Sequence, residues 1–204
     1  MAALHVVVLL AAAWCAVALA VAFGRAKALG TRRLFAPPSG DAQAGVRYAF
    51  TKGMAPQAKE SVRMNPVSYL AGMLYHTGVF AAFGLLVMHL AGWGGSRILA
   101  VLALGGALGG LALLFKRIVK PHLRGISCGD DYLSNGLATA FATLAGFAVF
   151  APGLTSPWLL ETTALLIYVP MGKIRHCVFF FSTRYHSGAF FGRRGVFPPG
   201  LGRA

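Results

Sequence analysis

Two histidines stand inside long apolar stretches of this chain, where an ionisable side chain is costly and usually serves a function. His76 lies in SYLAGMLYHTGVF, and His176 lies in YVPMGKIRHCVFFF beside Lys173 and Arg175. A neutral imidazole is the commonest protein ligand for a metal ion, and it also forms hydrogen bonds and transfers protons. The role that applies depends on the helices that carry the two side chains.

The composition indicates that both histidines lie in a membrane. Hydrophobic residues make up 57% of the 204 residues and charged residues only 12%, which excludes an ordinary soluble domain. Five apolar segments are close to the ~20 residues that a helix needs to cross a bilayer. They are 3–23, 66–92, 98–115, 132–150 and 157–181. We therefore predict an all-α integral membrane protein with five transmembrane helices, in a single membrane domain covering 1–204.

The basic residues predict the orientation of these helices. Eight of the 19 Lys and Arg residues lie between the first two helices, four between the third and fourth, and six from Lys173 onward. Short loops rich in Lys and Arg usually stay in the cytoplasm. We therefore predict an outside N-terminus, a cytoplasmic loop at 24–65 and a cytoplasmic tail at 182–204. The net charge of +14 reflects this topology and an attraction to membrane lipid, and it does not indicate nucleic-acid binding.

The two histidines reach similar depths if the predicted helices are continuous. At ~1.5 Å of rise per residue, His76 lies about ten residues, or roughly 15 Å, from the cytoplasmic end of the second helix. His176 lies about eighteen residues, or roughly 27 Å, along the fifth helix from its outer end. Both positions fall in the cytoplasmic half of a hydrocarbon layer ~30 Å thick. Two histidines from different helices at one level can ligate a haem iron from its two sides.

Neighbouring residues suit a haem b held in this way. Gly72 and Gly172 each precede a histidine by four residues, so a flat macrocycle can pack where no side chain projects. Lys173 and Arg175 can pair with the haem propionates, and no CxxCH motif predicts covalent attachment. Each feature also has an alternative explanation: the histidines can hydrogen-bond between helices, the two cations can anchor the chain at the membrane interface, and the glycines can serve helix packing. Helix packing is also what the GxxxG spacing of LALGGALGGLALL, in the third predicted helix, predicts.

Three blocks of the sequence carry a resemblance to a known family. They are LYHTGV, then ISCGDDYLSN at the start of the fourth predicted helix, then YVPMGKIRH. Together, over residues from about 48 to 194, they resemble the gamma-subunit cytochrome b family of respiratory nitrate reductase. They are more similar still to its relatives in sulfite-reduction-associated and heterodisulfide-reductase-like membrane complexes.

The resemblance implies a function for the whole chain. It implies a five-helix subunit of a bacterial or archaeal cytoplasmic membrane that transfers electrons between a membrane quinone, menaquinone or ubiquinone, and a cytoplasmic iron–sulfur subunit. That partner would be heterodisulfide-reductase-like or nitrate-reductase-beta-like. By the same resemblance, His76 and His176 are the axial ligands of the haem nearer the cytoplasm.

The second haem of that family, nearer the outer face, lacks a matching ligand pair here. His89 follows His76 by thirteen residues where the resemblance implies ten, and thirteen steps of ~100° turn it about 140° away from the first ligand. No histidine lies near Trp158 in the fifth predicted helix. We therefore predict one haem b rather than two, with His5 and His89 as ligands of an unconventional second haem as the alternative.

Glu161, in SPWLLETTALL, is the one acidic residue well inside a predicted span. A carboxylate within a membrane is costly and suggests a function. Glu161 and His89 both lie near the outer ends of their helices, so together they can hydrogen-bond a quinone head group and exchange protons with the outer aqueous phase. Alternatively, Glu161 only stabilises the N-terminus of its helix as an anion in the first turn.

The segments outside the predicted helices offer surfaces for a partner. The loop at 24–65 and the tail, with its FFGRRGVFPPG, have compositions suited to docking a soluble subunit or to anchoring at the membrane surface. Asp130 or Asp131 can cap the fourth helix. The sequence thus predicts an electron-transfer subunit rather than an enzyme by itself, and the alternative is a haem-free membrane anchor that recruits a soluble partner.

Overall fold

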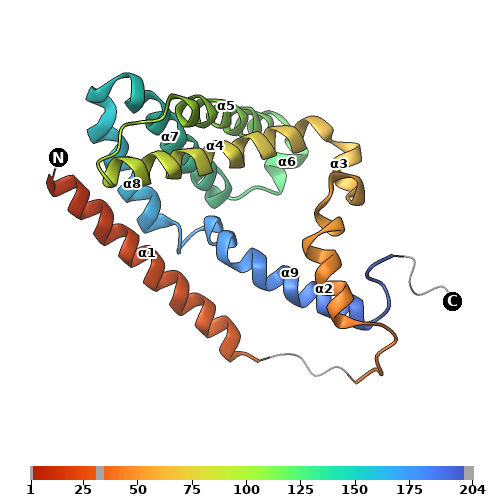
Figure 1. The fold of residues 1–204 in the computed structure, drawn as a ribbon. Coiled ribbons are helices and arrows are strands. Elements are labelled where there is room, and N and C mark those ends of the chain that lie inside the picture. The colour runs from red at the N-terminus through yellow and green to blue at the C-terminus, as the bar shows by residue number, and fades with distance from the viewer. Residues whose placement is uncertain (1, 31–34, 200–204) are drawn as a thin grey trace. The chain divides into compact units, whose positions relative to one another are not determined.

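The structure is a computed structural model that describes residues 2–30 and 35–199 (Figure 1). The chain is all-helical, and the described residues contain no strand. It divides into two compact units, each built from separate stretches of the sequence. The first unit comprises Met1–Ala18 and Val67–Ile174, and the second comprises Leu19–Pro66 and Arg175–Ala204.

Four helices in the described residues are long and apolar enough to cross a membrane. They are α1 (Ala2–Ala28), α4 (Pro66–Leu90), α5 (Arg97–Val119) and α7 (Gly129–Phe150). Large apolar side chains such as Phe80, Ile98 and Leu108 are well exposed on them, as on surfaces that face lipid. Long apolar helices are thus confirmed at the first four predicted segments.

The fifth predicted helix, at 157–181, is interrupted in the structure. After the turn η3 (Pro152–Leu154), α8 (Thr155–Tyr168) is followed by a turn, by η4 (Lys173–Arg175) and by α9 (His176–Arg193). Pro170 has no amide hydrogen, and the amides of Met171 and Gly172 both donate back to the carbonyl of Tyr168, at 2.9 and 3.0 Å. The two helices thus count as one broken span at most.

This interruption removes two arguments made from the sequence. The depth of roughly 27 Å for His176 counted helical rise through residues that are not helical. Gly172 and His176 also do not lie one turn apart on a common helical face, because they flank the start of α9. Gly72 and His76, by contrast, do lie in one continuous helix, α4.

The predicted loop and tail contain more helix than the sequence suggested. The loop holds α2 (Ala42–Phe50), η1 (Lys52–Met54), η2 (Pro56–Ala58) and α3 (Glu60–Met64), and α6 (Pro121–Gly125) lies between α5 and α7. Asp41 caps α2, because its Oδ1 accepts from the amide of Gln43 at 2.8 Å. α9 continues into the predicted tail as far as Arg193. Residues 31–34 of the loop and 200–204 of the tail lie outside the described residues.

Small residues let the helices of the first unit pack at very short range. A Cβ built on Gly106 of α5 would overlap the backbone of Gly78 in α4, and one on Gly109 would crowd the carbonyl of Ala71. The packing role predicted for LALGGALGGLALL is therefore confirmed. The largest fully buried side chains of this unit come from α1, α7 and α8: Val8, Phe141, Leu159, Thr162 and Leu165.

The second unit is built on a contact between α2 and α9. A Cβ on Gly45 would overlap the backbone of Gly188 and Gly192, so the two helices lie backbone to backbone. The amides of Ser39 and Gly40 donate to the carbonyl of Arg193 at 2.9 and 3.1 Å. Parts of the predicted loop and tail therefore form one packed body.

Candidate functional site

His76 lies near the middle of α4, and one hydrogen bond fixes its tautomer. Its Nδ1 donates to the backbone carbonyl of Gly72, at 2.7 Å. Because a carbonyl oxygen only accepts, the hydrogen of the neutral ring lies on Nδ1 and the lone pair lies on Nε2. Metal-ligating histidines are commonly oriented in this way, with one ring nitrogen bonded to a carbonyl and the other directed at the metal.

The neighbouring Tyr75 fixes the rotation of α4. Its hydroxyl donates to the carbonyl of Asn135 at 2.9 Å and accepts from Thr139 Oγ1 at 3.1 Å, so Tyr75 faces α7. The next residue along a helix is turned by ~100°, and His76 is accordingly exposed. Phe80 lies one turn further on, with its ring centroid 6.4 Å from that of His76.

Gly72 leaves open space beside His76. A Cβ built at this position would meet no atom within 4 Å. One turn of α4 therefore presents an imidazole with a directed Nε2 lone pair, an aromatic ring and a position without a side chain. This combination fits a flat macrocycle ligated by His76, because the ring needs an uncrowded face around its axial ligand.

The other predicted haem contacts lie around the start of α9. His176 is the first residue of α9, belongs to the second unit, and is exposed like Arg175. A Cβ on Gly172 would overlap the ring of Tyr168, so Gly172 packs against its own chain. The ligand pairing of His76 with His176 joins a residue from each unit and stays a prediction. The haem-packing role of Gly172 has no such open space to support it.

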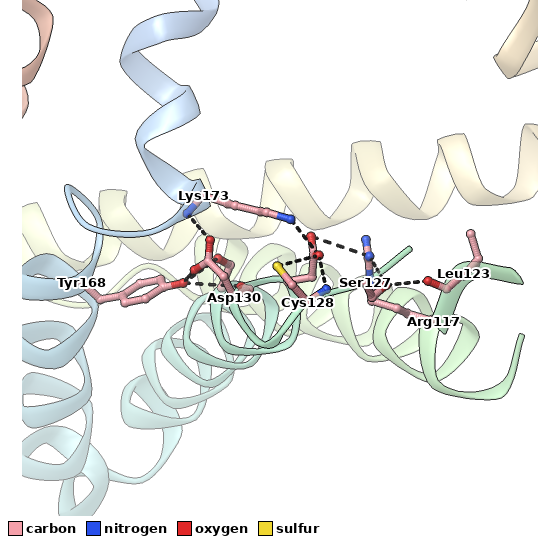
Figure 2. A network of polar contacts seen from close by, with 9 residues as sticks. Arg117, Leu123, Ser127, Cys128, Asp130, Tyr168 and Lys173 are labelled. Carbon is pink, nitrogen blue, oxygen red and sulfur yellow. Dashed lines mark hydrogen bonds and ion pairs between the residues drawn. The ribbon is translucent and has the colours of Figure 1, made fainter. Parts of the chain in front are cut away.

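Asp130 holds the turn that follows α8 (Figure 2). Its carboxylate accepts from the hydroxyl of Tyr168, at the end of α8, and from the backbone amide of Lys173, at 3.0 Å. Ser134, one turn further along α7, lies 2.9 Å from the same Tyr168 hydroxyl. The start of α7 is therefore tied to Tyr168, which precedes the segment that interrupts the fifth predicted helix, and to Lys173 within that segment.

Asp131 completes this network, which we call the acidic clasp (Asp130, Asp131, Tyr168 and Lys173). Its Oδ2 accepts from the amide of Cys128 at 3.0 Å, so the predicted capping of this helix is confirmed. The same oxygen lies 2.7 Å from Lys173 Nζ, and Oδ1 lies 3.7 Å from Arg117 Nη1. The ammonium of Lys173 thus pairs with a protein carboxylate, the kind of group that a haem propionate would have to replace.

A second polar group lies at the other end of α8. His5 of α1 and His89 of α4 approach through their Nε2 atoms at 3.0 Å, and their ring planes are nearly perpendicular at 82°. The ring of Trp158 lies 5.4 Å from that of His89, centroid to centroid. Two imidazoles on opposite sides of one iron, each ~2 Å from it, would hold their nitrogens ~4 Å apart. The observed pair is hydrogen-bonded, in place of the ligand pair considered for a second haem.

A cavity of about 160 Å³ adjoins this pair. His89, Trp93, Thr155 and Trp158 provide its polar lining, and Leu85 and Val149 are among its apolar walls. Trp158 is only 3% exposed, and its Nε1 has no hydrogen-bond partner among the residues that the structure describes. Trp158 thus contributes to the cavity lining, while its Nε1 is itself buried.

Glu161 does not share this cavity with His89. Its Oε1 is buried, and residues 2–30 and 35–199 supply it with no hydrogen-bond partner, but it is absent from the cavity lining. Trp158, three residues earlier in α8, is the neighbour of His89 instead. The sequence carried one signal for the position of Trp158, since Trp158 and Glu161 are three residues apart and lie on one helical face.

Comparison of the chain with protein-family models, with curated proteins and with solved structures gave no match. The class of protein therefore follows from the fold. The several apolar helices are consistent with a multi-pass membrane protein.

Proposed function

We propose that this chain is the haem b subunit of a respiratory oxidoreductase in a bacterial or archaeal cytoplasmic membrane. It transfers electrons between a membrane quinone, menaquinone or ubiquinone, and a cytoplasmic iron–sulfur subunit. The observation that carries the proposal is the geometry of His76, whose Nδ1 is bonded to the Gly72 carbonyl in the middle of an apolar helix. The resemblance of three sequence blocks to the nitrate reductase gamma family supports the same function.

His76 supports haem ligation because its surroundings suit a ligand better than a lipid contact. An ionisable side chain inside a membrane helix suggests a function. The tautomer places a lone pair on Nε2, and Gly72 leaves room beside it. His176 is the proposed second ligand, and Arg175 the proposed partner of a propionate. A haem bound there supplies reversible one-electron transfer, while the protein fixes its orientation through α4.

The second unit is the proposed docking surface for the iron–sulfur subunit. Its sequence ranges, 19–66 and 175–204, carry 13 of the 19 Lys and Arg residues but only two of the five Asp and Glu residues. One of these two acidic side chains, Asp41, is used as a helix cap. A surface with this excess of cations attracts an acidic partner and, by the positive-inside rule, lies in the cytoplasm.

Haem content tests the proposal directly. A reduced-minus-oxidised spectrum and a pyridine haemochrome titration of the purified chain should give a b-type spectrum with one haem per chain. His76→Ala and His176→Ala should each abolish it, whereas His122→Ala, a change in the short helix α6, should leave it intact. Helical circular dichroism and a monodisperse elution profile establish that each variant is folded.

A haem-free membrane anchor is the second candidate, and two observations favour it. Lys173 is already paired with Asp131, and the space at Gly172 is filled by Tyr168, so two predicted haem contacts are used within the protein. A folded preparation that retains its partners but contains no haem would overturn the first candidate and support this one.

A further inference from the structure

The first half of α9 carries aromatic side chains that the described residues leave uncovered. Phe181 and Tyr185, one helical turn apart, are 62% and 55% exposed, and Phe180 is 36% exposed. The part of α9 that packs on α2 is its second half, where Gly188 and Gly192 are buried. The exposed rings therefore form an apolar surface, which we call the aromatic face (Phe180, Phe181 and Tyr185).

The end of α1 indicates what covers this face. α1 is long and apolar enough to cross a membrane, and its last turn carries Arg25 and Lys27. Cations at the end of a membrane helix normally lie at the level of the lipid head groups. Phe23 lies one turn before Lys27, and its ring centroid is 6.2 Å from that of Phe179 in α9. Both rings belong to the second unit, so the start of α9 lies beside the head-group end of α1.

The charges of this segment suit an anionic lipid. The guanidinium of Arg184 lies over the ring of Phe180, 5.6 Å from its centroid, so the cation is held beside the aromatic face. A guanidinium can bind a phosphate through two parallel hydrogen bonds. The sequence from 162 to 204 contains no Asp or Glu, so no carboxylate of this segment repels a lipid phosphate.

We propose that the aromatic face of α9 lies in the membrane surface and that Arg184 binds the phosphate of an anionic phospholipid there. Phe180 and Phe181 then contact acyl chains, and the hydroxyl of Tyr185 lies among the head groups, where amphipathic aromatic side chains are enriched. This lipid contact goes beyond the proposed function and needs no haem. It leaves the remaining surface of the second unit for a docking partner.

Fluorescence quenching of the full chain in lipid nanodiscs tests the contact with the membrane. Cys128→Ser and Cys177→Ser remove the two exposed thiols, and Cys15 is buried, so Phe181→Cys supplies one site for a bimane label. A phosphatidylcholine with a nitroxide near the head-group end of an acyl chain should quench this label. Iodide, which stays in water, should not.

The opposite end of α9 provides the control position. Gln43 is exposed in α2, two residues after Asp41, whose carbonyl lies against Gly192. Bimane at Gln43→Cys, in the same background, should be quenched by iodide and not by the nitroxide lipid.

The label at Phe181→Cys also tests the anionic lipid. Nitroxide-labelled phosphatidylglycerol should quench it with about fivefold higher apparent affinity than the phosphatidylcholine, the gain expected for one arginine at a membrane surface. Arg184→Gln should remove this difference. Arg194→Gln is the matched control and should keep it, since Arg194 stacks on Phe190 in the second half of α9.

Each result decides one part of the proposal. Quenching of the Phe181→Cys label by iodide, or by neither quencher, overturns the membrane contact, and a label at Tyr185→Cys repeats the test if Phe181→Cys does not fold. Equal quenching by the two lipids, with Arg184 present, overturns the phosphate contact. A haem-free preparation that passes both tests supports the lipid contact and overturns only the proposed function.

Discussion

At one end of α8, the hydroxyl of Tyr168 donates to Asp130, and Asp130 also accepts from the amide of Lys173. At the other end, Trp158 Nε1 has no partner among the described residues, and neither does Glu161 Oε1, which lies one turn further along. The same short helix thus carries polar atoms that are matched by the protein and polar atoms that are not. A satisfied network stabilises a backbone arrangement, whereas a buried polar group without a protein partner lowers stability.

The two ends of α8 also differ in what their polar residues do. The acidic clasp holds the segment 169–175, from which α9 starts at His176. The Trp158 end leaves a cavity of about 160 Å³ next to a pair of hydrogen-bonded imidazoles. We expect substitutions at the clasp to lower stability, and removal of an unsatisfied polar group at the Trp158 end to raise it.

The largest effect is expected from Gly106, because α5 lies there against the backbone of α4 in the first unit. A Cβ at Gly106 would overlap the backbone of Gly78, which cannot move aside as a flexible side chain can. Gly106→Ala should lower the free energy of unfolding by about 3 kcal/mol, the upper range for overpacking. Unfolding of the detergent-solubilised protein measures this change.

The adjacent glycine is the matched control for that substitution. A Cβ at Gly105 would meet only Leu74 Cδ1, at 3.7 Å, which is an ordinary contact. Gly105→Ala should therefore be neutral or stabilise by up to ~1 kcal/mol, because alanine favours the helix. Equal losses in the two variants would contradict the close contact between α4 and α5.

An intermediate effect is expected at the clasp. Asp130→Ala leaves the Tyr168 hydroxyl and the Lys173 amide without their acceptor, which should cost about 2 kcal/mol of unfolding free energy. Hydrogen exchange should also become faster at the backbone amides of 169–175. Glu60→Ala, in the short helix α3 of the second unit, serves as the control. Unchanged exchange at 169–175 would show that Asp130 does not hold this segment.

The smallest effect, and one of opposite sign, is expected at Glu161. Replacing Glu161 by Leu removes a buried oxygen that has no partner, so Glu161→Leu should raise the free energy of unfolding by about 1 kcal/mol. The same unfolding assay measures the gain, with Glu161→Gln, which keeps a polar group there, as the comparison. A loss of stability in Glu161→Leu would mean that the carboxyl group makes a favourable interaction in the membrane.

The sequence was sufficient for features that depend on composition or on neighbours within one helix. Apolar length predicted five helices, and four of them are continuous helices long and apolar enough to cross a membrane. Glycine spacing predicted close helix packing, and the acidic pair of ISCGDDYLSN predicted a helix cap. His76 and Gly72 are four residues apart in one helix, and the structure keeps them on one face.

Features that depend on distant contacts were not readable. Pro170 is tolerated within many membrane helices, so its presence did not predict the break after Tyr168. The bond from Tyr168 to Asp130 joins residues 38 positions apart, and the bond between His5 and His89 spans 84 positions. The position of Trp158 beside His89 follows from such contacts, which the sequence does not show.

The most direct test of the central claim is the electron paramagnetic resonance spectrum of the oxidised, purified protein, compared with His76→Ala. The account predicts a low-spin ferric signal typical of two histidine ligands in the wild-type protein. It predicts no haem, or only high-spin ferric haem, once His76 is removed. An unchanged low-spin signal in folded His76→Ala would show that His76 does not bind the iron and would contradict the account.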